Sequence, residues 1–140
     1  MPVSDDSFYE FLATGALYGI TVGSTTDAVS ARLGPPPETS KLRRVIIWAY
    51  GHRLLQVTLK RDRVVLIGVY PRYAKGTGGN VIDGSFPLPL DLNLEALRTR
   101  LRERAVPVVD SSRWPGALEI GAGHILAVFD EDGTLESLQI

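Results

Sequence analysis

Cysteine is absent from this chain of 140 residues, and histidine occurs only as His52 and His124. Without thiols the protein has no disulfides, thiolate zinc sites, iron–sulfur clusters or cysteine nucleophile. The two histidines are not at the short spacings that place several ligands on one metal ion, and neither lies near a Gly-x-Ser-x-Gly serine. We therefore expect no metal, no cofactor and no enzymatic activity, and we interpret both histidines as residues of a turn or a strand end.

Long hydrophobic runs are absent as well. The longest, at 45–49 and 64–70, have the length of a strand, whereas a membrane helix needs about 18 apolar residues. Residues 1–6 have neither the positive charge nor the apolar core of a secretion signal. We therefore expect a cytoplasmic protein with no membrane partner.

A large charge excess is also missing, because the formal net charge is −1 and the pI is about 6.1. No motif of a nucleic-acid reader is present, so we expect no nucleic-acid partner. The charge is nevertheless uneven along the chain: −4 over 1–31, +8 over 32–75 and −5 over 76–140. A molecule with a basic and an acidic region steers charged partners, unless folding interleaves the segments and cancels the field.

Three segments have the pattern of short helices. Residues 4–15 place apolar side chains on one face. A second helix begins after Ser24 or Thr25 and ends at Gly34, where three prolines follow. A third begins after Asn93 and carries leucines at spacings of three and four until about 104.

Strand patterns follow the second and the third helix. Residues 45–50, 53–60 and 64–70 have apolar residues in runs or in alternation, with a turn at Gly51-His52 and another at 60–63, and predict an antiparallel meander. After the third helix, 106–110 is an additional strand candidate. The segments 117–121, 124–129 and 134–140 then match the earlier three in order and length.

This repeated order predicts an α+β fold made by tandem duplication of a helix plus antiparallel β-meander unit, with helices packed on one face of a shared antiparallel sheet. We expect a single domain over 1–140. The first pseudo-repeat covers about 16–70, a connector covers 71–84, and the second pseudo-repeat covers about 85–140.

Two polar segments resemble ligand loops but fit them poorly. No lysine and no helix start follow Gly76-Thr77-Gly78-Gly79, so a flexible connector is favoured over a phosphate loop. The acidic run at 130–133 lacks the twelve-residue calcium-binding pattern and favours a hairpin turn. Three adjacent carboxylates are more than a turn needs, which permits a binding role.

A family resemblance follows from Ile20-Thr21-Val22-Gly23, Leu33-Gly34-Pro35-Pro36, Trp48-Ala49-Tyr50-Gly51 and the hairpin after them. The chain resembles the repeat of the small outer-membrane lipoprotein family (SmpA/OmlA, BamE-like) and of β-lactamase inhibitor proteins. It is also similar to small bacterial cytoplasmic proteins, some of which are immunity proteins encoded beside toxins. The resemblance covers 20–70, with a degenerate second copy over 88–140. The absence of a lipobox cysteine and of disulfide pairs departs from the lipoproteins and the secreted inhibitors.

The resemblance implies a sheet whose open face is available to another protein. We accordingly expect a non-enzymatic protein-binding module, and specifically an immunity protein that binds and neutralises a cognate bacterial toxin. The candidate partner-binding residues are large or charged and fall in predicted loops or turns: Tyr73, Trp114, Asp130, Glu131 and Asp132. A structural or assembly module and a small enzyme or ligand-binding protein are the alternatives, and the oligomeric state is left open.

Overall fold

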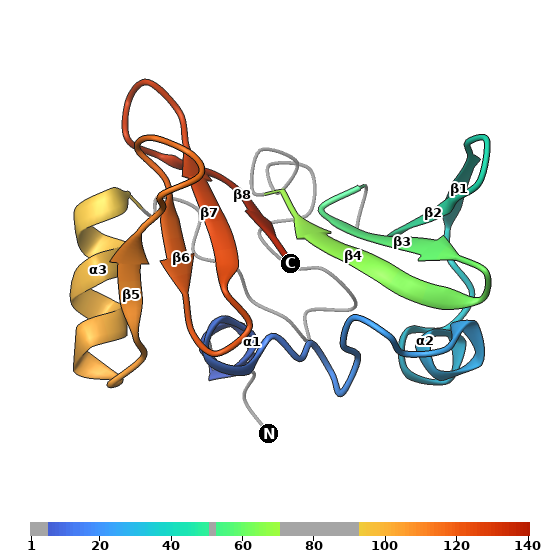
Figure 1. Cartoon of the computed structure of the whole chain (residues 1–140). Coiled ribbons are helices and arrows are strands. Elements are labelled where there is room, and N and C mark those ends of the chain that lie inside the picture. Colours follow the sequence, from blue (N-terminus) through green and yellow to red (C-terminus); the bar gives the residue numbers. More distant parts are fainter. Residues whose placement is uncertain (1–5, 51–52, 71–92) are drawn as a thin grey trace.

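The computed structural model describes residues 6–50, 53–70 and 93–140. Its main feature is a sheet of eight strands in the order β1-β2-β3-β4-β8-β7-β6-β5 (Figure 1). Every pair of neighbours is antiparallel. The strands are β1 (Glu38–Lys41), β2 (Ile46–Tyr50), β3 (Leu55–Lys60), β4 (Arg63–Val69), β5 (Val108–Asp110), β6 (Leu118–Ile120), β7 (Ile125–Phe129) and β8 (Leu135–Gln139).

The seam between β4 and β8 joins segments from the middle and the end of the chain into this one sheet. Gly68 pairs with Gln139 and Val69 with Leu138. Two further backbone hydrogen bonds extend the seam, because Ile67 and Ile140 each donate to the carbonyl of the other at 2.9 and 3.0 Å. All other pairings in the sheet join strands that are consecutive in the chain.

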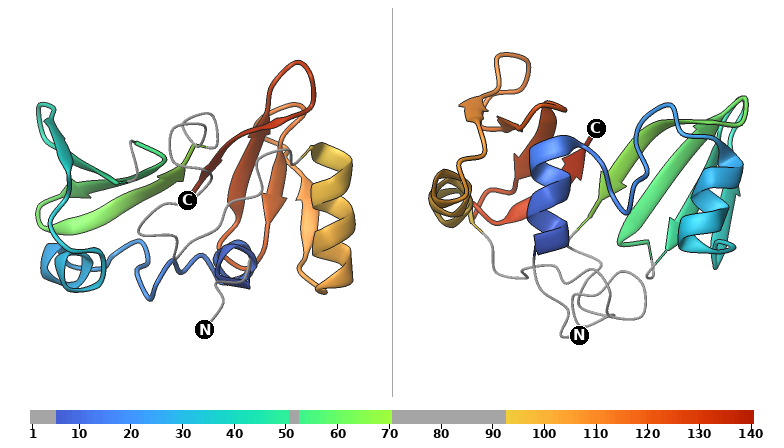
Figure 2. Two further views of the ribbon diagram at one scale, coloured as in Figure 1. Left: turned by 180° about the vertical axis from the view of Figure 1, so that it is seen from behind. Right: turned by 90° about the horizontal axis from the view of Figure 1, so that it is seen from below.

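Three short helices complete the described part of the chain: α1 (Asp6–Thr14), α2 (Thr26–Leu33) and α3 (Leu94–Glu103). The side chains of Thr25 and Asn93 cap α2 and α3 by accepting hydrogen bonds from the amides of Ala28 and Ala96. In the view from below, α1 lies between the end of the molecule that carries α2 and the end that carries α3 (Figure 2). The helices α2 and α3 therefore begin where the capping residues predict.

The predicted architecture is wrong. The molecule is mostly an eight-stranded antiparallel sheet with a few short helices, and not a duplicated unit with helices packed on the sheet. Each of α2 and α3 buries only two hydrophobic side chains, so these helices supply a small part of a core that comes mainly from the strands. The sheet also has a strand, β1, that the sequence pattern did not reveal. The predicted connector at 71–84 lies outside the described residues.

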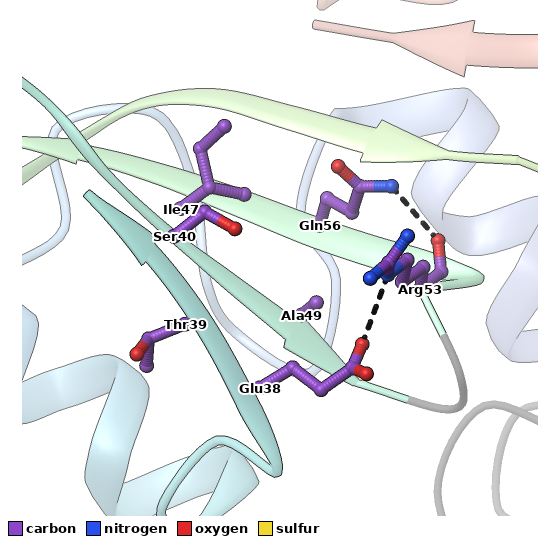
Figure 3. Close-up of a pocket in the computed structure, with 7 residues that line it drawn as sticks. All are labelled: Glu38, Thr39, Ser40, Ile47, Ala49, Arg53 and Gln56. Atoms are coloured by element: carbon purple, nitrogen blue, oxygen red, sulfur yellow. Dashed lines mark hydrogen bonds and ion pairs between the residues drawn. The ribbon is translucent and has the colours of Figure 1, made fainter. Parts of the chain in front are cut away.

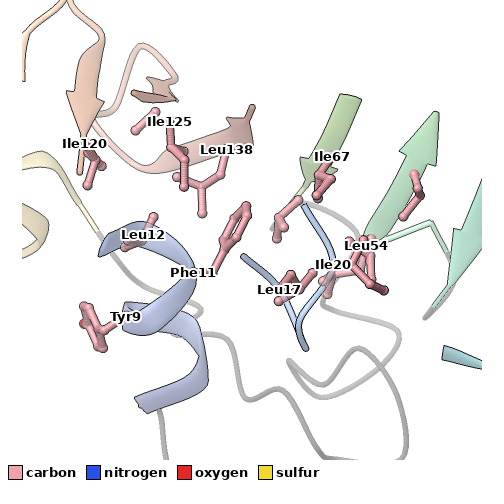
Figure 4. Close-up of a cluster of buried hydrophobic side chains, with 14 of the residues drawn as sticks. Tyr9, Phe11, Leu12, Leu17, Ile20, Leu54, Ile67, Ile120, Ile125 and Leu138 are labelled. Atoms are coloured by element: carbon pink, nitrogen blue, oxygen red, sulfur yellow. The ribbon is translucent and has the colours of Figure 1, made fainter. Parts of the chain in front are cut away.

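The hydrophobic core is one cluster that receives side chains from both ends of the sheet. Phe11 and Leu12 of α1 are fully buried and lie close to the side chains of β6, β7 and β8 in Figure 4. Just after α1, Leu17 and Ile20 lie near Leu54 and β4 (Figure 4). Residues 9–20 thus supply the apolar contacts that connect the two ends of the sheet.

The end of α1 is held against the turn between β6 and β7. The amide of Ala122 donates to the carbonyl of Ala13 at 3.0 Å. Gly121 has a φ of +71°, and a Cβ there would collide with the backbone oxygens of Leu12 and Ala13. Only glycine allows this approach without strain.

No helix among the described residues is long and apolar enough to cross a membrane.

Candidate functional site

A hollow of about 230 Å³ brings together two loops at one end of the sheet. One is the β5–β6 loop, which carries Trp114, and the other is the β7–β8 turn, which carries Asp130 and Glu131. The two are neighbours because β6 and β7 pair in antiparallel register, with Leu118 opposite Ala127. We call this hollow the Trp114 pocket; its lining is Leu94, Trp114, Pro115, Gly116, Ala117, Val128, Phe129, Asp130, Glu131 and Gly133.

The β5–β6 loop is folded around the side chain of Ser111. Its Oγ accepts hydrogen bonds from the amides of Arg113 and Trp114 at 3.2 and 3.1 Å, and donates to Glu119 Oε2 at 3.0 Å. The amide of Ala117 closes the loop by donating to the carbonyl of Trp114 at 3.1 Å. These bonds fix the backbone of the loop that carries Trp114, and Trp114 is 56% exposed. Because hydrogen bonds already restrict this loop, binding of a partner over Trp114 costs little further loss of loop conformational entropy.

The acidic β7–β8 turn is organised by Asp130. Its Oδ1 accepts hydrogen bonds from the amides of Asp132 and Thr134 at 2.9 and 3.0 Å. The amide of Gly133 donates to the carbonyl of Asp130 at 3.0 Å, and Gly133 has a φ of +80°. Asp130 therefore builds the turn, as short acidic side chains commonly do. Glu131 and Asp132 are exposed, so their charges are available to a partner.

Of the five predicted binding residues, the structure brings three together in the Trp114 pocket: Trp114, Asp130 and Glu131. Asp132 belongs to the same turn but does not line the pocket. Tyr73 lies outside the described residues. Sequence reasoning named the indole and the acids together as candidate partner-binding residues, but it did not show that they line one hollow.

A polar cluster around Glu119 was not predicted. Glu119 is in the middle of β6 on the face opposite the core, and its side chain is 15% exposed. Arg113 Nε lies 3.9 Å from its Oε2, and His124 Nδ1 lies 3.9 Å from its Oε1. Arg113 and His124 also line a hollow of about 410 Å³ over β4, β7 and β8. The alternation of Leu118, Glu119 and Ile120 was the available signal for a carboxylate on the open face.

A second unpredicted hollow, of about 420 Å³, lies over β1, β2 and β3 (Figure 3). Arg53 Nε is 3.1 Å from Glu38 Oε2, and Gln56 Nε2 donates to the carbonyl of Arg53 at 3.0 Å. Arg53 has a φ of +73°, which is uncommon for a residue with a side chain. Sequence analysis did not assign a strand to 38–41, and the hollow could not be found without it.

The groups that line the Trp114 pocket are an indole, two carboxylates and apolar side chains. Across the described residues, no group of three or more histidine, aspartate and glutamate side chains is arranged to hold a metal ion. Burial raises the pKa of the Tyr50 hydroxyl to about 12, but Tyr50 is in the core and outside the Trp114 pocket. The Trp114 pocket combines an apolar surface with two carboxylates, which suits a ligand that carries both apolar and basic groups.

Comparison with known proteins adds little to this picture. No protein-family model matches the chain, and no curated protein matches it. Among solved structures, it is similar to an extracellular protein containing an SCP domain from Bacillus anthracis strain Ames, with 14% identity and a TM-score of 0.45. The match covers 99% of this chain and 46% of that one, so this chain spans about half the length of the protein it matches.

Proposed function

We propose that this chain is a non-enzymatic binding module that holds a protein partner at the Trp114 pocket. The observation that carries the proposal is that an exposed indole and the acidic β7–β8 turn meet in one hollow. Tryptophan is enriched among the residues that dominate the energy of protein interfaces. Carboxylates beside it favour a basic partner and accelerate its approach.

More specifically, we propose that the chain is a cytoplasmic immunity protein that binds and neutralises a cognate bacterial toxin. Its support is the resemblance of residues 20–70 to proteins of that kind, together with the charge of −5 over 76–140. In this arrangement the acidic turn faces a basic substrate cleft of the toxin. Covering that cleft inhibits the toxin without any chemical step by the immunity protein.

The site is tested with a partner captured by the tagged chain from its native host. Trp114→Ala should weaken binding about thirtyfold or more, the usual effect of removing a dominant interface residue. Val65→Ala is the matched control, because Val65 is also a large exposed apolar residue but is on β4. Equal binding by wild type and Trp114→Ala, measured by surface plasmon resonance, would remove the pocket from the proposal.

The acidic turn is tested in the same assay with the double variant Glu131→Gln, Asp132→Asn. Asp130 is left intact because its side chain builds the turn. The association rate should fall about tenfold at low salt and show a weaker salt dependence. The control is Glu10→Gln, Glu103→Gln, which removes two exposed acids from helices. A partner that associates equally fast with both double variants does not use the turn.

The proposal that the chain is an immunity protein is tested in living cells. The chain should restore growth when it is co-expressed with a toxin encoded beside its own gene, and the Trp114→Ala variant should restore it poorly. If the captured partner is harmless when expressed alone, the immunity assignment fails although the binding site can still stand.

A further inference from the structure

The strand β1 ends the sheet on the side opposite to β5. It pairs with β2 alone, and all four of its residues are exposed. At the other edge α3 lies beside β5, and Arg98 Nη2 is 2.6 Å from Asp110 Oδ1 (Figure 1). The two edges thus differ, because Asp110 of β5 is paired with Arg98 of α3, whereas all four residues of β1 are exposed. An uncovered edge is a template for another strand.

The hairpin between β1 and β2 determines which backbone groups of β1 face outward. The amide of Leu42 donates to the carbonyl of Val45 at 2.9 Å, and Ser40 is opposite Ile47. Because antiparallel ladders alternate, Ser40 and Glu38 direct their amide and carbonyl groups toward β2. Thr39 and Lys41 direct theirs toward the open edge. The amide and carbonyl groups of Thr39 and Lys41 are therefore available for hydrogen bonds to an added strand.

The same hairpin is basic. Lys41, Arg43 and Arg44 are exposed, and none of them forms an ion pair with an acid among the described residues. Glu38 does not offset this charge, since it is paired with Arg53 at 3.1 Å. The outward backbone groups of β1 are thus flanked by three uncompensated positive charges.

The hollow over β1, β2 and β3 lies next to this edge (Figure 3). Glu38 and Ser40 point toward it from β1, and Ile47 and Ala49 of β2 form its apolar part. Side chains of an added strand point alternately to the two faces of the sheet. Those on the open face would lie beside the hollow, where space and a mixed polar and apolar lining are available.

We propose that β1 is a docking edge for an acidic, extended segment of a partner protein, which adds to the sheet as another strand. The outward groups of Thr39 and Lys41 hold its backbone, and Lys41, Arg43 and Arg44 select its charge. This interaction is separate from the Trp114 pocket, which is formed by elements at the other end of the sheet. The proposal therefore does not depend on the proposed function.

The charge argues for an acidic partner segment over a second copy of this chain. Parallel pairing of two β1 edges would bring two basic hairpins side by side, where like charges oppose association. Antiparallel pairing would set each hairpin beside Glu38 of the other copy, whose carboxylate is already paired with Arg53. Lysine at an exposed edge is a recognised protection against self-pairing. An added acidic strand would instead be attracted by the positive charges of Lys41, Arg43 and Arg44.

The test uses a fluorescent octapeptide of alternating glutamate and threonine, with an otherwise identical lysine–threonine peptide as the control. Fluorescence polarisation should detect binding of the acidic peptide only. The double variant Arg43→Gln, Arg44→Gln should weaken it about fivefold to tenfold. Lys60→Gln, Arg61→Gln is the matched control, because it removes two exposed cations at the end of β3 and in the β3–β4 turn and should change the affinity less than twofold.

Strand addition is tested separately from charge. Thr39→Pro removes an outward amide at an edge where proline is tolerated, and should weaken binding about fivefold to tenfold. In the wild-type protein, amide exchange followed by NMR should slow at Thr39 and Lys41 when the acidic peptide binds, and change little at Ser40. This second readout does not depend on the folding of the proline variant.

Three results would overturn the proposal. Equal binding of the acidic and the basic peptide would exclude charge selection. Unchanged exchange at Thr39 and Lys41 would show a purely electrostatic contact. A free protein that sediments as a dimer, and becomes a monomer as Thr39→Pro, would make a second copy the occupant of the edge.

Discussion

At the scale of single residues, Tyr50 shows how burial and one hydrogen bond act together. Its hydroxyl donates to the carbonyl of Gly34 at 2.9 Å, which ties β2 to the end of α2. The side chain is buried, and loss of hydration raises its pKa to about 12. The neutral hydroxyl is therefore the form that the folded protein requires.

Tyr50 should make stability fall in strongly basic solution. In the unfolded chain this hydroxyl ionises near pH 10, whereas in the folded protein it ionises near pH 12. The stabilisation that the neutral hydroxyl gives the folded protein is therefore complete below pH 10. As the pH rises toward 12, the free energy of unfolding falls by on the order of 2 kcal/mol. Tyr50→Phe should lose about 1 kcal/mol at neutral pH with the hydrogen bond.

Urea unfolding of the two proteins at several pH values measures this effect. The stability advantage of wild type over Tyr50→Phe should shrink as the pH rises above 10. Other titrating groups are common to both proteins and cancel in the difference. An advantage that stays constant up to pH 12 would contradict the assigned pKa.

Gly121 shows a different constraint, which is the close approach of two backbones. Gly121→Ala should destabilise the protein by at least about 3 kcal/mol, because a Cβ there meets the carbonyl oxygen of Ala13 at 2.7 Å and φ is positive. Gly116→Ala is the matched control, since Gly116 has a φ of +83° but nothing within 4 Å of a Cβ. It should cost about 1 kcal/mol. Thermal unfolding that shows equal losses would contradict the contact between α1 and the β6–β7 turn.

At the scale of elements, each of α2 and α3 begins against a hairpin turn. The amide of Thr26 donates to the carbonyl of Asp62 at 3.0 Å, and the amide of Leu94 donates to the carbonyl of Gly133 at 3.1 Å. These bonds satisfy amides at the helix start that have no partner within the helix. The β7–β8 turn therefore fixes the start of α3 while it presents the acids of the Trp114 pocket.

The cap of α3 should be measurable. Asn93→Ala removes the acceptor that lies 2.8 Å from the amide of Ala96 and should cost about 1 kcal/mol of unfolding free energy. Thr99→Ala is the control within the same helix; it is exposed and should change stability by a few tenths of a kcal/mol in the opposite direction, because alanine has the higher helix propensity. Circular dichroism during thermal unfolding distinguishes the two. A neutral Asn93→Ala would contradict the capping role.

At the scale of the whole molecule, α1 and the residues after it join the two ends of the sheet through the core. Phe11→Ala should therefore cost about 3 to 5 kcal/mol, the usual effect of removing a fully buried aromatic side chain. Val65→Ala, at an exposed position of β4, should cost less than about 1 kcal/mol. Denaturant unfolding should show one transition by tryptophan fluorescence and by circular dichroism. Separate transitions in wild type would contradict a shared core.

The sequence by itself determined the local elements of this protein. Thr25 and Asn93 mark the starts of α2 and α3, and Leu55, Val57 and Leu59 alternate with polar residues along β3. These signals are local, because caps and periodicity act between residues that are near in the chain. The prediction that Trp114 and the acidic run lie in loops rested on the same kind of signal.

Only the tertiary structure decided how the elements combine. Residues 38–41 have no apolar alternation, so β1 exists through its pairing with β2 alone. The seam between β4 and β8 joins strands that are far apart in the chain, and the sequence pattern did not indicate which strands meet there. The meander pattern already implied the pairing of β6 with β7, but it did not show that Trp114, Asp130 and Glu131 line one hollow. The seam depends on contacts between residues far apart in the chain, which a local pattern does not contain.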